Sequence, residues 1–274
     1  GTAAAYGIGR AVSAGIDSLA ELESATSSVD GALRATGNSG KVTAKQIATW
    51  ANEIEASVGA AFDDKPITLA ASQLIRYGKV APDSLKKAMQ VMTDLAPATG
   101  GVETASRQLS KALADPTIVK SIGRNIKLTA TEVQLLAATG GLNEAQKKRY
   151  DALKKQSPEA AKAYMARVKE SKLTKAQAVL LDILAKKTQG AALASQGPYK
   201  RAQTTLADAT EDAQRALAEG FLPVIIKISD FLRTKLADPK VIAGIREFGA
   251  GLASAFDKAA TFVMGLDWDK IGSA

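Results

Sequence analysis

Residues 95–116 read LAPATGGVETASRQLSKALADP and contain one complete helix with the signals that start and stop it. Glu103 and Arg107 lie four residues apart with the acid first, the favourable order for an ion pair along a helix. Two glycines precede the helix, and Pro116 predicts its end because proline has no amide proton to continue the hydrogen-bond ladder. Spacings of three and four predict one buried apolar stripe: Val102, Ala105, Leu109, Ala112 and Leu113. The stretch has no reactive side chain, so we expect it to serve packing.

The composition of the whole chain favours the same kind of structure. Its 274 residues are 46% hydrophobic but only 5% aromatic, and sequences rich in alanine and poor in aromatic residues favour helix over strand. Cysteine and histidine are both missing, which excludes thiolate nucleophiles, serine–histidine–acid triads and histidine-bound zinc. Catalysis by carboxylates or lysine stays open, but we expect no enzyme, no cofactor and no metal site. No secretory signal pattern is present.

Start and stop signals divide the chain into a series of helices. Capping-box sequences predict helix starts, because a threonine or asparagine oxygen accepts an amide of the first turn while a Gln or Glu reaches back. They begin at Thr43, Thr129, Asn143 and Thr174. Further caps are expected at Asp64, at Asp83 and at Ser157, which is followed by proline. Helix stops are expected at Gly59, Gly78, Gly100, Gly123, Gly140, Gly190 and Gly220.

We therefore predict an all-α fold: a multi-helix array of short to medium helices with long N-terminal and C-terminal helices and no β-sheet. The expected parts are a long helix over residues 1–36, a multi-helix domain over 41–190 and C-terminal helices over 197–274, with a linker before Pro198 and a bend at Pro223. Because the sequence starts without methionine, we expect a fragment of a longer chain. Small residues in the first helix and on a stripe through Tyr199, Leu206 and Leu217 predict close helix packing, within the chain or between subunits.

The positive charge of the chain, +8 overall, is concentrated in one segment. Between residues 143 and 175 ten basic side chains face only four acidic ones. The basic residues are Lys147, Lys148, Arg149, Lys154, Lys155, Lys162, Arg167, Lys169, Lys172 and Lys175. Such a patch either is a solvated helix face or contacts phosphates, anionic lipid or an acidic protein wall. Only two tyrosines accompany it, and no known nucleic-acid motif is present.

Two glycine-containing segments have some features of nucleotide-binding loops but lack others. The segment that starts at Gly7 has no preceding strand and carries valine where a dinucleotide-binding turn needs its third glycine. The segment from Gly37 to Thr43 has valine where a phosphate loop needs a hydroxyl. We interpret the first as the flexible start of a helix and the second as a loop between helices.

Seven segments follow one another in an order that is more specific than any one of them. They are residues 50–58, 67–78, 95–116, 122–128, 176–184, 190–193 and 220–223. The first of their motifs is Ala-Thr-Gly, which precedes a helix that ends Leu-Ala-Asp-Pro. The motifs that follow, in order, are Ile-Gly-Arg-Asn-Ile-Lys-Leu-Thr, Ala-Gln-Ala-Val-Leu-Leu-Asp-Ile-Leu, Gly-Ala-Ala-Leu-Ala and Gly-Phe-Leu-Pro. The series, over roughly residues 20–235, resembles the conserved helical region of the tail tape measure proteins of tailed bacteriophages.

The resemblance implies a mostly helical structural protein of the virion, in the lumen of the tail tube or at the tail tip. Such a protein sets tail length during assembly and is ejected with DNA delivery. The implied partners are tail tube and tail tip proteins and further copies of itself, in a homo-oligomer that we expect to be a trimer. The resemblance implies no catalytic residue, and any contact with nucleic acid would be non-specific. The many helix stops predict a folded domain here instead of a continuous rod.

Two alternatives stay open. In the first, the chain is a membrane-active or envelope-penetrating module, whose apolar helices at residues 221–236 and 248–266 insert into the host envelope and form a passage for phage DNA. The first helix is shorter than the roughly 20 residues of a membrane span and charges interrupt the second, so we expect core helices. In the second alternative, carboxylates such as Asp63 and Asp64 catalyse a reaction, but their position before Pro66 is typical of a helix cap.

Overall fold

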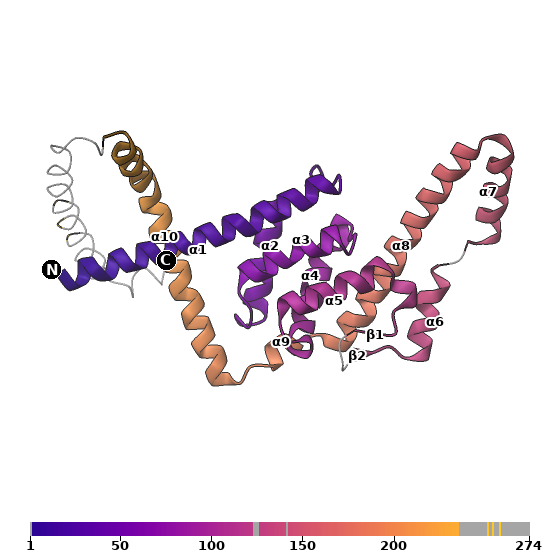
Figure 1. Ribbon diagram of the computed structural model, residues 1–274. Coiled ribbons are helices and arrows are strands. Elements are labelled where there is room, and N and C mark those ends of the chain that lie inside the picture. The colour runs from indigo at the N-terminus through magenta and orange to yellow at the C-terminus, as the bar shows by residue number, and fades with distance from the viewer. Residues whose placement is uncertain are drawn as a thin grey trace, which may run out of the picture. The chain divides into compact units, whose positions relative to one another are not determined.

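The computed structural model describes residues 2–122, 126–140 and 142–235, together with Gly251, Ser254 and Lys258 (Figure 1). The chain divides into two compact units. Gly1–Glu21 and Ala207–Ala274 form one unit, here called the terminal unit, and Leu22–Leu206 form the other, here called the central unit. The described residues are almost entirely helical, which confirms the predicted all-α fold with long helices at its two ends.

The helices are α1 (Thr2–Ala35), α2 (Ala44–Ser57), α3 (Asp64–Arg76), α4 (Pro82–Thr99), α5 (Val102–Ala114), α6 (Ala130–Ala138), α7 (Glu144–Gln156), α8 (Pro158–Thr188), α9 (Ala191–Ala194) and α10 (Pro198–Lys235). A 3-10 turn, η1 (Pro116–Ile118), follows α5. The expectation of no β-sheet is wrong in one detail, because β1 (Ser121–Ile122) pairs antiparallel with β2 (Ile126–Lys127). Strands of two residues are too short to show the alternation by which a sequence indicates a strand.

The core of the central unit lies between α2, α3, α4, α5 and the C-terminal half of α8. The stripe predicted for α5 is buried in full, from Val102 to Leu113. Leu109 and Leu113 are completely inaccessible, and the burial of each contributes about 1.5–3 kcal/mol. On the solvent side of the same helix, Arg107 and Glu103 form the expected ion pair at 3.6 Å. The helix therefore has the packing role that its sequence predicts.

Three of the four predicted capping boxes are confirmed, at Thr43, Thr129 and Asn143. The fourth is wrong, because Thr174 lies inside α8, and its hydroxyl donates to the carbonyl of Glu170 at 3.0 Å. α8 instead starts at the predicted cap Ser157, whose Oγ accepts the amide of the third helical residue. A cap sequence inside a helix forms no start when packing continues the helix on both sides of it.

Two other predicted caps are displaced, and one stop is wrong. Asp63, and not Asp64, caps α3, since its carboxylate accepts the Lys65 amide at 2.8 Å. α4 starts before Asp83, with proline in its first turn and no side-chain cap. Gly220 lies inside α10, and so does Pro223 where a bend was expected.

The other predicted glycine stops have different outcomes. Gly59, Gly100 and Gly190 adopt positive φ and end or follow a helix as predicted. Gly78 and Gly140 also follow a helix end. The expected stop at residue 123 lies outside the described residues. Where φ is positive, glycine avoids the steric cost that a side chain would have.

In the terminal unit α1 and α10 cross (Figure 1), and at the crossing there is no room for a side chain on Gly15. A Cβ atom at Gly15 would lie 2.1 Å from the carbonyl oxygen of Gln214 and 2.8 Å from the Cβ of Ala218. Next to this contact the Arg215 Nε donates to the Ser18 hydroxyl at 2.6 Å. Gly15 and Ser18 of the first helix therefore pack within the chain, whereas a Cβ atom at Gly7 or Gly9 would meet nothing within 4 Å.

The stripe predicted on α10 is exposed at three positions, Tyr199, Leu206 and Leu217. Leu222 and Ile226, in the segment expected to be core, are exposed as well. None of the described helices combines the length and the apolar composition that a membrane span requires. Most of the second apolar segment, residues 248–266, lies outside the described residues.

Candidate functional site

The basic segment of the sequence folds into a helical hairpin of α7 and the N-terminal half of α8, here called the basic hairpin (residues 144–175) (Figure 1). The Asn143 capping box starts α7, and Ser157 with Pro158 ends it and starts α8. α7 has no buried residue. On α8 the buried residues of this half are Ala161 and Val168. The hairpin is thus thin, with its few apolar contacts on the inside and polar side chains elsewhere.

The structure brings the ten predicted basic residues together on this hairpin. Nine of them are exposed, and Lys172 is half-buried. Within the described part of the chain none of the ten forms an ion pair. Elsewhere in the central unit basic side chains do pair with acids: Arg34 with Asp30, Lys65 with Asp63, Lys86 with Glu53, Lys87 with Asp182, Arg107 with Glu103 and Lys187 with Glu132. The positive charge of the hairpin is therefore not compensated by neighbouring acids.

One cation–π contact joins the two helices of the hairpin. The guanidinium carbon of Arg149 lies 5.7 Å from the ring centroid of Tyr164, a distance at which the ring quadrupole attracts the cation. The contact occupies Tyr164 on the side that faces α7. Since both tyrosines of the hairpin are half-buried, neither presents a free ring for stacking.

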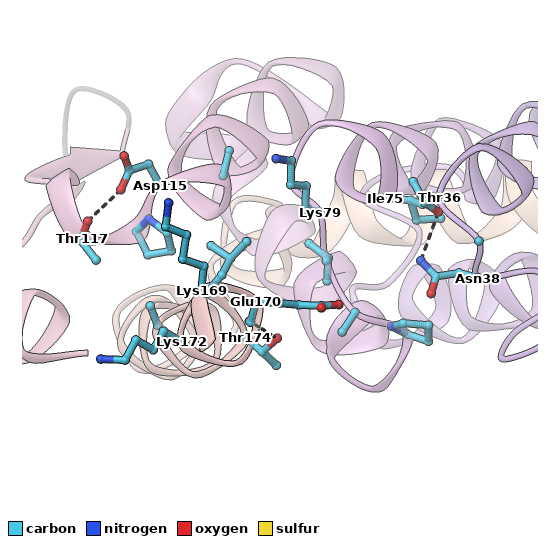
Figure 2. Close-up of a pocket in the computed structure, with 18 of the residues that line it drawn as sticks. Thr36, Asn38, Ile75, Lys79, Asp115, Thr117, Lys169, Glu170, Lys172 and Thr174 are labelled. Carbon is cyan, nitrogen blue, oxygen red and sulfur yellow. Dashed lines mark hydrogen bonds between the residues drawn. The ribbon is translucent and has the colours of Figure 1, made fainter. Parts of the chain in front are cut away.

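A cavity of about 950 Å³ lies at the base of the hairpin, where the loop after α1, the loop between α3 and α4, the end of α5, η1 and α8 meet. Four lysines line it: Lys41, Lys79, Lys169 and Lys172. Figure 2 shows Lys79 and Lys169 extending their amino groups toward the same side of the view, and Lys172 toward another. Two acids, Asp115 and Glu170, also line the cavity.

Four other polar side chains of the cavity are hydrogen-bonded in two pairs. The Thr117 hydroxyl donates to the Asp115 carboxylate at 2.8 Å, and the Asn38 amide donates to the Thr36 hydroxyl at 3.1 Å (Figure 2). The lysines of the cavity form no ion pair with any described residue. They are the groups that an anionic ligand would contact.

Sequence reasoning identified the two α8 lysines of this cavity and missed Lys41 and Lys79. These two lie in different loops far from α8 in the sequence, and no local pattern relates them to it. The cavity continues the positive surface of the hairpin toward its base, because Lys169 and Lys172 belong to both.

The two carboxyl groups with shifted pKa values have structural roles outside the cavity. Burial raises the pKa of Asp94, although the carboxylate accepts the Ala192 amide of α9 at 3.4 Å. In the Thr129 capping box the backbone amide of Thr129 donates to Glu132 at 2.7 Å and lowers the pKa of that carboxyl, and Lys187 lowers it further. Asp94 thereby positions α9, and Glu132 fixes the start of α6.

Asp63 and Asp64 both have structural roles at the start of α3. Asp63 caps α3, and Asp64 is a buried residue of its first turn, where the amide donates to Glu55 at 3.1 Å. In the described ranges no three acidic side chains cluster in a way that could hold a metal ion.

A comparison with protein-family models, curated proteins and solved structures finds no match. Function is therefore inferred from the sequence motifs and the geometry.

Proposed function

We propose that this chain is a structural segment of a phage tail tape measure protein, which lies in the tail tube lumen or tip, sets tail length during assembly and is ejected with the DNA. One observation supports this role above others: the segments that carry the family resemblance coincide with helix ends and buried helix faces. Ala-Thr-Gly ends α4, Leu-Ala-Asp-Pro ends α5, and residues 176–184 form the buried half of α8. Motifs used in this way serve packing, as expected of a structural protein.

The lengths of the terminal helices fit an elongated assembly. At about 1.5 Å per residue, the 34 residues of α1 and the 38 residues of α10 extend over about 50 and 57 Å. The helices of the central unit instead pack side by side. A segment of this kind adds less length per residue than a continuous helix would.

The exposed stripe of α10 supports a homo-oligomer. Tyr199 is 84% exposed and Leu206 70% exposed, although both are apolar enough that burial between subunits would be favourable. Tail tube and tail tip proteins are the other proposed partners. Sedimentation of the purified chain and of a Leu206→Glu variant tests the self-association, since a stripe that packs between copies would be disrupted by the charge.

The measurement that tests the ruler role is tail length in phage particles assembled with lengthened proteins. We expect an insertion of ten helical heptads, placed inside α10, to lengthen the tail by about 100 Å at 1.5 Å per residue. An insertion of one heptad in the same place should lengthen it by about 10 Å. Electron micrographs of purified particles give the lengths. Tails of unchanged length with the longer insertion would rule out the proposed role.

The membrane-active module is the second candidate, and one observation favours it. Leu222, Val224 and Ile226 are exposed on α10, next to half-buried Phe221. An apolar helix segment of this kind could lie in a bilayer interface after release from the tail. Leakage of a dye from vesicles with anionic lipid tests this function. A chain that neither binds nor permeabilises such vesicles excludes it.

A further inference from the structure

We propose that the basic hairpin binds the phosphate backbone of a nucleic-acid duplex, without sequence preference. This inference goes beyond the ruler role and does not depend on it. It rests on the charge of the hairpin, on the distribution of that charge and on the fact that no large hydrophobic side chain of the hairpin is exposed.

The charge is available for binding. The segment 143–175 contains ten basic and four acidic side chains. Within the part of the chain that the structure describes, none of the ten forms an ion pair. An incoming phosphate therefore has no protein carboxylate to displace. The gain in binding comes mostly from the release of counterions that the duplex holds.

The distribution of the charge matches a line of phosphates better than a single anion. On α7 the basic residues run from Lys147 to Lys155, over about 12 Å of helix, and on α8 from Lys162 to Lys175, over about 20 Å. A duplex has about one charge per 1.7 Å of its axis, so about a dozen phosphate charges lie along 20 Å. A duplex turn rises about 34 Å, so the hairpin presents its cations over about a third to just over half of a turn.

The alternative polyanions fit the hairpin less well. An interfacial membrane helix needs an apolar face opposite its basic face, but no large hydrophobic side chain of the hairpin is exposed, and its exposed apolar side chains are alanines and one proline. Single strands are held by exposed aromatic rings, whereas Tyr150 and Tyr164 are half-buried. Contact with phosphates alone carries no sequence information.

The cavity at the base extends the binding surface. Lys79 reaches it from the loop after α3 and lies among the cavity residues with Lys169 and Lys172 (Figure 2). A backbone phosphate placed here would meet lysines from two separate parts of the fold. Glu170 is the opposing charge that limits how deeply a phosphate enters.

The experiment measures binding of the whole chain to a fluorescent 30-base-pair DNA duplex of arbitrary sequence, at several salt concentrations. In the hairpin variant Lys147, Lys148, Lys154 and Lys155 become Gln. These side chains are exposed on a helix without buried residues, so the fold is retained. In the control variant the same number of exposed, unpaired lysines outside the hairpin become Gln: Lys45, Lys111, Lys200 and Lys227.

We expect the hairpin variant to bind about 100-fold or more weakly at 0.1 M salt, and its plot of log K against log salt to be shallower by about 3 to 4. The control variant should lose much less affinity. Equal loss in both variants would overturn the proposal, because net charge alone would then explain binding. So would tighter binding to phosphatidylserine vesicles than to the duplex at the same salt, which would identify a membrane as the partner. Unequal affinity for unrelated duplex sequences would contradict the lack of sequence preference.

Discussion

We expect the side chain of Gln177 to contribute more to the stability of the central unit than other side chains of its size. It is 1% exposed on α8, and its amide nitrogen donates to the carbonyl of Gly78 at 2.8 Å and to that of Leu113 at 2.9 Å. Both protons of the amide are thus used. The two carbonyls stand in the chain after α3 and near the end of α5, so one side chain joins three segments.

The test is Gln177→Met, which preserves the length of the side chain and a good helix propensity but removes both donors. A buried polar group left without a partner costs about 1–3 kcal/mol. With two carbonyls the expected loss is about 2–5 kcal/mol, a large part of the 5–15 kcal/mol typical of folded proteins. For a unit of this size the loss corresponds to a fall in Tm of about 5–15 °C.

Urea titration followed by circular dichroism at 222 nm gives the free energy of unfolding. The control is Gln134→Met on α6, because the side chain of Gln134 is exposed and makes no hydrogen bond. The free energy of unfolding of this variant should stay within about 0.5 kcal/mol of the parent. Gln177→Glu should be worse than Gln177→Met at neutral pH, since a carboxylate would face two carbonyl oxygens. A loss below about 1 kcal/mol for Gln177→Met, or equal values for the Met and Glu variants, would refute the reasoning.

Two other variants test the helix crossing and the buried acid. Gly15→Ala should separate α1 from α10, because its Cβ would lie 2.1 Å from the Gln214 carbonyl oxygen. Hydrogen exchange of the amides at the crossing should then accelerate. In the control Gly9→Ala the new Cβ meets nothing within 4 Å, so the exchange should be unchanged or slower. Burial raises the pKa of Asp94 above the ordinary 3.8, so the ionised form destabilises the folded state as pH rises through that range. Asp94→Asn keeps an acceptor for the Ala192 amide and should raise the free energy of unfolding at pH 7. The gain should vanish below pH 3.8, where the carboxyl is protonated in both states. An unchanged free energy of unfolding at pH 7 would contradict this.

The parts of the fold that local chemistry decides were predictable from the sequence. The Thr43 and Thr129 capping boxes depend on four consecutive residues, and both formed. The Thr174 pattern is just as good locally, yet α8 continues through it. There the side chain of Gln177 bonds carbonyls from far along the chain, and such partners are invisible to a four-residue pattern.

The candidate site was predictable only in part, for the same reason. The ten basic residues of the hairpin are close in sequence, so composition revealed them. Lys41 and Lys79 reach the cavity through the fold, and their contribution depends on how α1, α3 and α8 pack. The missing ion pairs could not be predicted from spacing either, since acids three or four residues away were available on the same helices. The close approach at Gly15 likewise depends on a residue nearly two hundred positions later.

The crossing at Gly15 also constrains the order in which the protein can fold. The two segments of the terminal unit are separated in sequence by the whole central unit. Closing a flexible loop of that length would cost about 4–5 kcal/mol of chain entropy. A central unit that folds first shortens the effective loop and removes much of that cost. On the ribosome, α1 is made first but must wait for α10, so the apolar side of its first half stays uncovered until most of the chain has been synthesised.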